Sequence, residues 1–193
     1  MPRTIRVMLT DDLEMHRSML RMNLGSYTRN HPEVAFQVLA ECANGGELLT
    51  ALGDVEPDLI TLDIRMPEMD GLTTLLHLRR RLRLRCPILM ASSEEEANVD
   101  RFFKERVSEQ VRSLSFDDKC GHMDKVEERV LSGQREAGKI NDLLPGCEKL
   151  RLDPVRYADH LGASGFLQKP YTPEQTDTAL AAVLAGKAFQ ASR

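Results

Sequence analysis

Short apolar runs alternate with amphipathic stretches over most of the chain. The apolar runs are bounded by acids, prolines or glycines, as is typical of buried strands, and they cover residues 5–10, 34–40, 59–62, 87–91 and 165–168. Between them, apolar residues recur at helical spacing and predict helices over residues 13–27, 45–52, 72–84 and 173–184. Thr172 and Pro173 are suited to the N-cap and first position of the last helix.

Strands that alternate with helices indicate the α/β class. Such a pattern predicts a doubly wound parallel sheet with helices on both faces. In these folds ligands bind just beyond the carboxyl ends of the strands. The residues that follow the predicted strands are therefore the first candidates for a functional site.

Charged and hydroxyl side chains follow four of the five predicted strands. Asp11 and Asp12 follow the first strand, Asp63 the third, Ser92 ends the fourth and Lys169 follows the last. Three carboxylates that converge at one edge repel one another, and a hard divalent cation relieves the repulsion. Oxygen-only ligands suit Mg²⁺, and a lysine and a hydroxyl can hold a phosphoryl group on a carboxylate nucleophile.

Four motifs at these strand ends resemble the response-regulator receiver domains, the CheY-like proteins of two-component phosphorelay signalling. They are Leu-Thr-Asp-Asp at 9–12, Leu-Asp-Ile-Arg-Met-Pro-Glu-Met-Asp-Gly at 62–71, Met-Ala-Ser-Ser at 90–93 and Gly-Phe-Leu-Gln-Lys-Pro at 165–170. The resemblance covers residues 3–97 and 155–187. It implies a flavodoxin-like five-stranded sheet of order 2-1-3-4-5.

The resemblance implies a role for each matched residue. Asp63 would be the phosphoacceptor, forming an aspartyl phosphate with the help of Ser92 and Lys169. Magnesium, for which Mn²⁺ can substitute, would be held by Asp11, Asp12, Asp63 and the backbone carbonyl of Arg65.

A conformational switch is also implied. Ser92 stands at the switch hydroxyl position and Phe166 at the switch aromatic position. The Lys169–Pro170 bond is expected to be a cis peptide.

The function that follows from the resemblance is that of a single-domain response regulator. A sensor histidine kinase or phosphotransfer protein would phosphorylate it. It would act by binding another protein through the face of the fourth helix, the insertion before the fifth strand, the fifth strand and the fifth helix. It would not be a conventional enzyme, since phosphoryl transfer and autodephosphorylation at Asp63 are self-catalysed. Two alternatives stay open: a phosphate sink or phosphorelay intermediate, and a dimer scaffold.

Each site residue also has an ordinary structural explanation. Asp11 and Asp12 could cap the next helix, Ser92 could be an N-cap, and Phe166 could be plain core. His16 and His77 are interpreted as surface residues. The combination of four motifs in register favours the functional interpretation.

A long segment separates the fourth and fifth strands. Ser92 and Lys169 lie much farther apart than in ordinary receivers, so residues 98–153 are interpreted as a helical insertion that replaces or extends the fourth helix of a single domain, 1–193. Turns are expected at 117–121 and 132–138, and a helix through Leu143 and Leu144 is expected to stop at Pro145. Three apolar stripes predict two or three helices, and they consist of Val99, Phe102, Phe103, Val107, Val111 and Leu114, then Met123, Val126 and Val130, then Ile140, Leu143 and Leu144. Whether the segment packs on its own domain or offers a docking or dimer surface stays open.

Two charged features near the site have further interpretations. Arg65 and Glu94 each lie two residues beyond a site residue, and we hypothesise that they pair over the site and slow dephosphorylation. The arginines in 79–85 are expected to complement a helix C-terminus.

Composition narrows the partners and the compartment. The net charge of −4 gives no reason to expect nucleic acid or an anionic membrane. Four scattered cysteines form no paired framework and predict a reducing, cytoplasmic location. No apolar stretch of the sequence is long enough for a signal peptide or a membrane helix. We expect no separate DNA-binding domain.

Overall fold

Helices and strands alternate along the computed structural model, which describes residues 2–53, 55–93, 113–133 and 143–187. The strands are β1 (Arg3–Thr10), β2 (Val34–Cys42), β3 (Leu59–Leu62), β4 (Ile88–Ser92) and β5 (Gly165–Gln168). The helices of the first half are α1 (Glu14–Asn30), α2 (Gly45–Ala51) and α3 (Gly71–Leu76), which continues into a turn of π-helix, η1 (His77–Arg81). The helices of the second half are α6 (Phe116–Ser132), α7 (Leu143–Leu150), α8 (Pro154–His160) and α9 (Pro173–Leu184).

The five strands form one parallel sheet in the order β2-β1-β3-β4-β5, which confirms the predicted fold class and order. Every residue of β3 and β4 is buried, as expected of inner strands that are covered on both faces. Thr10 is in register with Leu62, and Ser92 with Gln168. The residues after these strands therefore leave the sheet at the same edge.

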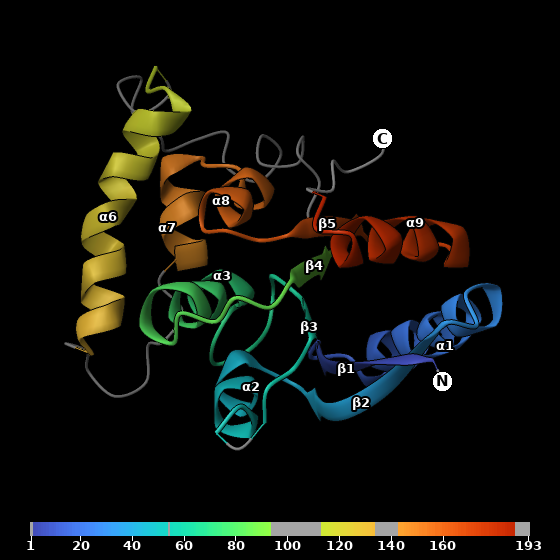
Figure 1. The fold of residues 1–193 in the computed structure, drawn as a ribbon. Coiled ribbons are helices and arrows are strands. Elements are labelled where there is room, and N and C mark those ends of the chain that lie inside the picture. The colour runs from blue at the N-terminus through green and yellow to red at the C-terminus, as the bar shows by residue number, and fades with distance from the viewer. Residues whose placement is uncertain (1, 54, 94–112, 134–142, 188–193) are drawn as a thin grey trace.

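Two apolar clusters cover the two faces of the sheet. On one face, α1 and α9 pack side by side over residues such as Val7, Leu59 and Leu89. On the other face, α2, α3, α6, α7 and α8 share a single cluster with Met8 and Leu62. Figure 1 shows α6 as the outermost element on this side, beyond α7. The described helices between β4 and β5, which are α6, α7 and α8, thus pack on this face of the sheet.

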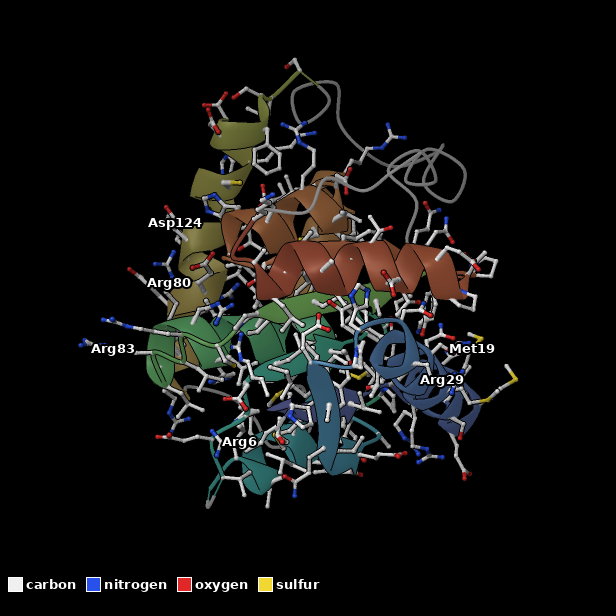
Figure 2. All side chains as sticks on the ribbon, turned by 45° about the vertical axis from the view of Figure 1, so that its right-hand side comes forward. Arg6, Met19, Arg29, Arg80, Arg83 and Asp124 are labelled. Atoms are coloured by element: carbon white, nitrogen blue, oxygen red, sulfur yellow. The ribbon has the colours of Figure 1, made fainter. Side chains whose placement is uncertain are left out.

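The helix after β3 is shorter than predicted. It was expected over 72–84, but α3 gives way to η1 at His77, and Arg83 adopts a positive φ of 53°. The guanidinium of Arg79 donates to the carbonyls of Leu84, Cys86 and Gly162. This arginine therefore ties the end of the helix to the chain before β5, which differs from the expected interaction with the helix dipole. Figure 2 shows Arg80 and Arg83 projecting outward from the same end.

The turn predicted at 117–121 is wrong, because α6 begins at Phe116. The Ser115 hydroxyl accepts from the Asp118 N–H, and the Asp118 carboxylate accepts from the Ser115 N–H and hydroxyl, which makes a capping box. Gly121 lies inside the helix, where a Cβ would meet no atom within 4 Å. At the other end Gly133 adopts a left-handed φ of 66° and ends α6. This agrees with the start of the turn expected at 132–138, whose residues 134–138 lie outside the described ones.

The helix stop predicted at Pro145 is also wrong. Pro145 and Gly146 lie inside α7. Proline is tolerated there because the N–H groups of a first helical turn have no acceptor within the helix. A Cβ on Gly146 would lie 3.0 Å from the Met123 side chain, so the glycine lets α7 approach α6 closely. The stripe predicted over 99–111 and the start of the third at Ile140 lie outside the described residues.

Candidate functional site

Three carboxylates meet at the carboxyl edge of β1 and β3, where the strand order reverses. One oxygen from each of Asp11, Asp12 and Asp63 can be chosen so that all lie within 4.8 Å of one another. Asp11 and Asp63 are buried, whereas Asp12 is exposed. The Asp63 N–H donates to the Thr10 carbonyl at 2.9 Å, which fixes the two strand ends against each other. The carboxylates converge as the sequence predicted.

A buried ammonium group lies between two of these carboxylates. Lys169 Nζ is 2.5 Å from Asp11 Oδ2 and 3.1 Å from Asp63 Oδ2. The Lys169 N–H donates to the Ser92 carbonyl at 2.8 Å, so β4 positions the start of this segment. The peptide bond from Lys169 to Pro170 is cis. Positive charge is thus supplied from the opposite end of the sequence.

The electrostatics of Asp63 reflect its burial. Loss of solvation raises the pKa of the Asp63 carboxyl above its ordinary value, and the Asp11 charge acts in the same direction. The Lys169 ammonium and the Ser92 hydroxyl lower it. Asp63 Oδ1 also accepts from the Ile64 N–H at 2.7 Å. The carboxylate is therefore held in a fixed orientation by its own strand end.

The two expected switch residues are both buried. Ser92 is fully buried at the end of β4, and its hydroxyl makes no hydrogen bond of normal geometry to any described residue. Phe166 is 7% exposed and lies in the apolar cluster that also holds Cys147 of α7 and Tyr157 of α8. The same cluster therefore includes β5 and the helices that precede it.

The loop from Asp63 to Asp70 folds back tightly onto the end of β3. The Gly71 N–H donates to the Ile64 carbonyl at 2.8 Å, and a Cβ on Gly71 would lie only 1.9 Å from the Asp63 carbonyl oxygen. Asp70 caps α3, accepting from the Thr73 N–H at 2.7 Å. Only a glycine at position 71 permits this approach.

Helix α7 forms one side of a pocket beside the acidic group. The pocket has a volume of about 430 Å³ and is lined by Asp12, Arg65 and Asp70 on one side and by Leu144, Pro145 and Glu148 on the other. Arg65 Nη1 donates to Glu148 Oε1 at 3.0 Å. The hypothesis that Arg65 pairs with Glu94 involves a residue outside the described ones. Among the described residues, Glu148 is an acidic partner of Arg65 that the sequence did not indicate.

Other residues at or near the site were missed or misread in the sequence. His16 is only partly exposed, and its Nδ1 lies 3.1 Å from Asp11 Oδ1. Arg17 Nη1 donates to the Asp11 carbonyl at 2.6 Å. His77 is buried, and burial lowers its pKa. The surface interpretation was therefore wrong for His77 and incomplete for His16, whose place in the first turn after Asp11 was the available signal.

The fold is that of a doubly wound α/β protein. Its candidate site contains three carboxylates and a lysine, and it lies at the topological switch point of the sheet. The chain belongs to the response regulator receiver domain family, whose model matches residues 7–111. It is 34% identical over 88 residues to the chemotaxis protein CheY of Bacillus subtilis, a match that covers 46% of this chain and 67% of that one.

Further relatives include protein-glutamate methylesterase/protein-glutamine glutaminase 2 of Carboxydothermus hydrogenoformans. The identity is 39% over 89 residues, which are 46% of this chain and 23% of that protein. The match thus spans less than a quarter of this relative's length.

Solved structures show the same fold. Chemotaxis response regulator CheY4 of Vibrio cholerae superposes with a TM-score of 0.53 at 19% identity, covering 94% of this chain and 99% of that one. The isolated receiver domain of RcsB from Salmonella enterica serovar Typhimurium gives 0.55 at 14% identity, covering 98% and 95%. No helix in the described ranges is long and apolar enough to cross a bilayer.

Proposed function

We propose that this protein is a phosphorylation-dependent switch that accepts a phosphoryl group on Asp63. The observation that carries the proposal is the convergence of the Asp11 and Asp63 carboxylates on the Lys169 ammonium at one buried edge. The Lys169 ammonium, together with a divalent cation held by the three carboxylates, would offset the negative charge that a phosphoryl group brings.

The acidic group fits a small divalent cation. Asp11, Asp12 and Asp63 offer only hard oxygen donors, and these lie close enough together to share one ion. We assign Mg²⁺, which Mn²⁺ can replace, with the backbone carbonyl of Arg65 as a further ligand. A bound ion would offset the carboxylate charge and orient the oxygens of a phosphoryl group.

The proposed chemistry is a direct transfer. An Asp63 oxygen attacks the phosphorus of the donor, and the new O–P bond forms as the bond from phosphorus to the donor breaks. Lys169 and the Ile64 N–H hold the nucleophile in place before attack. Lys169 then contributes positive charge to the transferred group, and the Ser92 hydroxyl donates to one of its oxygens.

The donor in this proposal is a sensor histidine kinase or a phosphotransfer protein, and the output is contact with another protein. Ser92 would move toward the phosphoryl group, and Phe166 would follow into the space that it leaves. Phe166 shares its cluster with α7 and α8, so its movement would alter the face formed by the helices before β5, by β5 and by α9.

Incubation with acetyl phosphate and Mg²⁺, followed by intact-mass measurement, tests the proposal. We expect the wild type to gain one phosphoryl group and Asp63→Asn to gain none. Asp58→Asn is the matched control, because Asp58 precedes the same strand at its far end and pairs with Arg6 at 3.1 Å. This control should be phosphorylated like the wild type.

The proposal fails if the wild type gains no mass, or if Asp63→Asn gains as much as the wild type. Chelation of the metal with EDTA should prevent the gain. Size measurement on the phosphorylated protein separates a monomeric switch from a dimer scaffold. A phosphoryl group that is lost quickly with no change in protein contacts would favour a phosphate sink.

A further inference from the structure

Helix α7 is attached to the loop that carries the candidate phosphorylation site. The Arg65 side chain, two residues after Asp63, donates to Glu148 of α7 at 3.0 Å. Burial raises the pKa of the Asp70 carboxyl, and the backbone N–H of Leu144, at the start of α7, is among the hydrogen-bond donors that oppose this shift. Both ends of the loop thus contact a helix that lies more than seventy residues farther along the chain.

These contacts border the same pocket as the acidic group. Asp12, Arg65 and Asp70 line one side of it and Glu148 lines the other. The Arg65 side chain is 52% exposed and that of Glu148 28% exposed, so their ion pair is weak and can be exchanged. A phosphoryl group offers a guanidinium more charge and more acceptor oxygens than one carboxylate does.

We propose that Glu148 and the phosphoryl group compete for Arg65, so that phosphorylation loosens α7 from the β3–α3 loop. This inference rests on the proposed function. When Arg65 turns toward the phosphoryl group, Glu148 is left facing Asp12, Asp70 and the new negative charge. Repulsion among these groups then weakens the packing of α7.

Thermodynamic linkage requires that the contact between Arg65 and Glu148 in turn affects phosphorylation. If phosphorylation weakens the contact between Arg65 and Glu148, loss of that contact must favour the phosphorylated state by the same factor. An exposed pair limits this factor to about two- to fivefold. Glu148 is therefore a positioning residue that holds Arg65 away from the site until the phosphoryl group arrives.

The chain carries its own reporter of α7 packing. Cys147 of α7 is fully buried in the cluster with Phe166, and burial raises its thiol pKa well above the ordinary value. Its alkylation therefore requires α7 to open. Cys86, which precedes β4 at the opposite edge of the sheet, is partly exposed and serves as the internal standard.

The experiment measures alkylation of Cys147 relative to Cys86 by peptide mass mapping of the full chain, with Mg²⁺ present throughout. Addition of acetyl phosphate should raise the Cys147 rate about two- to fivefold in the wild type and leave it unchanged in Asp63→Asn. Glu148→Gln should show the raised rate without acetyl phosphate and should hold a larger phosphorylated fraction at steady state.

Asp124→Asn is the charge-matched control. Asp124 is exposed on α6 and is labelled in Figure 2, and it does not line the pocket. This variant should behave as the wild type. Exchange of the two charges, Arg65→Glu with Glu148→Arg, should restore the low Cys147 rate in the unphosphorylated protein.

The outcomes separate the two proposals. If the wild type is phosphorylated and the Cys147 rate stays constant or falls, the competition is excluded while Asp63 remains the acceptor. The competition is likewise excluded if Glu148→Gln and Asp124→Asn show the same Cys147 alkylation rate and the same phosphorylated fraction. If the wild type gains no phosphoryl group, the proposed function and this inference fail together.

Discussion

The Asp63 carboxylate carries an energetic cost in its ionised form. Burial raises its pKa above the value of an unfolded chain, although Lys169 opposes the shift. The folded protein therefore binds this proton more tightly than the unfolded chain does. Ionisation of Asp63 lowers the free energy of unfolding, and this loss is complete above the folded-state pKa. Asp58 is the opposite case, since Arg6 lowers its pKa. The two ends of β3 are thus flanked by carboxyls whose pKa values are shifted in opposite directions, upward for Asp63 and downward for Asp58.

These opposite shifts predict opposite stability changes. At pH 7, Asp63→Asn should raise the thermal midpoint, because it removes the buried charge. Asp58→Asn should lower it, because it removes a stabilising pair. The Asp63→Asn difference should shrink as pH falls toward about 4, because the folded-state pKa of Asp63 is raised. The Asp58→Asn difference should persist at about pH 4 and shrink only at lower pH, because the folded-state pKa of Asp58 is lowered. Thermal unfolding of the three proteins from pH 7 to below about pH 4 measures both trends.

A thermal midpoint for Asp63→Asn below that of the wild type at pH 7 would contradict the expected stabilisation. It would mean that the attraction to Lys169 outweighs the cost of burial. At this chain length each kcal/mol corresponds to about 2–4 °C.

At the scale of the element, the β3–α3 loop depends on one glycine. Gly71 lies where any Cβ would overlap the Asp63 carbonyl, so the loop cannot keep its path with a larger residue. Gly121 is the contrasting case, inside α6 with open space around it. The two positions show how the same residue type is required in one element and only tolerated in another.

Substitution by alanine should therefore have opposite signs at the two glycines. Gly71→Ala should destabilise the protein by about 2–3 kcal/mol, because the loop must shift, and it should reduce phosphorylation by acetyl phosphate. Gly121→Ala should stabilise it by about 0.5–1 kcal/mol through helix propensity. Urea unfolding measures both changes. Equal stability of Gly71→Ala and the wild type would show that the loop can relax without cost.

The sequence predicted most elements in the first half because local patterns define them. The apolar runs of β3 and β4 and the N-cap of α9 depend on neighbouring residues alone. The convergence of the residues that follow the strands could be predicted as well, because the carboxyl ends of parallel strands meet at one edge of the sheet. The contacts of Arg79 with Gly162 and of Arg65 with Glu148 could not be predicted, since each joins segments far apart in sequence. The start of α6 was missed because the Ser115 capping box was not recognised.

At the scale of the whole molecule, the helices before β5 are part of the main core. Met123, Leu143 and Cys147 lie in the same cluster as Met8 and other residues of the sheet. A segment that shares the core in this way cannot leave without exposing apolar surface of the sheet. We therefore expect the described residues on both sides of the sheet to unfold as one unit.

This unity predicts a single unfolding transition. Loss of Cys147 protection from alkylation and loss of the far-UV circular dichroism signal should coincide along a urea titration. An earlier loss of Cys147 protection, with the dichroism of the sheet retained, would show instead that α6 and α7 form a separate unit. Cys42 in β2 is the matched buried cysteine, and its protection should be lost with that of Cys147.

The pairing of β4 with β5 has a consequence for the order of folding. Leu89 lies beside Gly165 in the sheet, although a long stretch of chain separates them. Each doubling of a closed loop adds about 0.6 kcal/mol of entropy cost, and this cost precedes the contacts that repay it. Strands β1 to β4 have shorter connections and can associate first. The last strand to join would be the one that carries Lys169 to the carboxylates, so the acidic edge would stay without its lysine until late in folding.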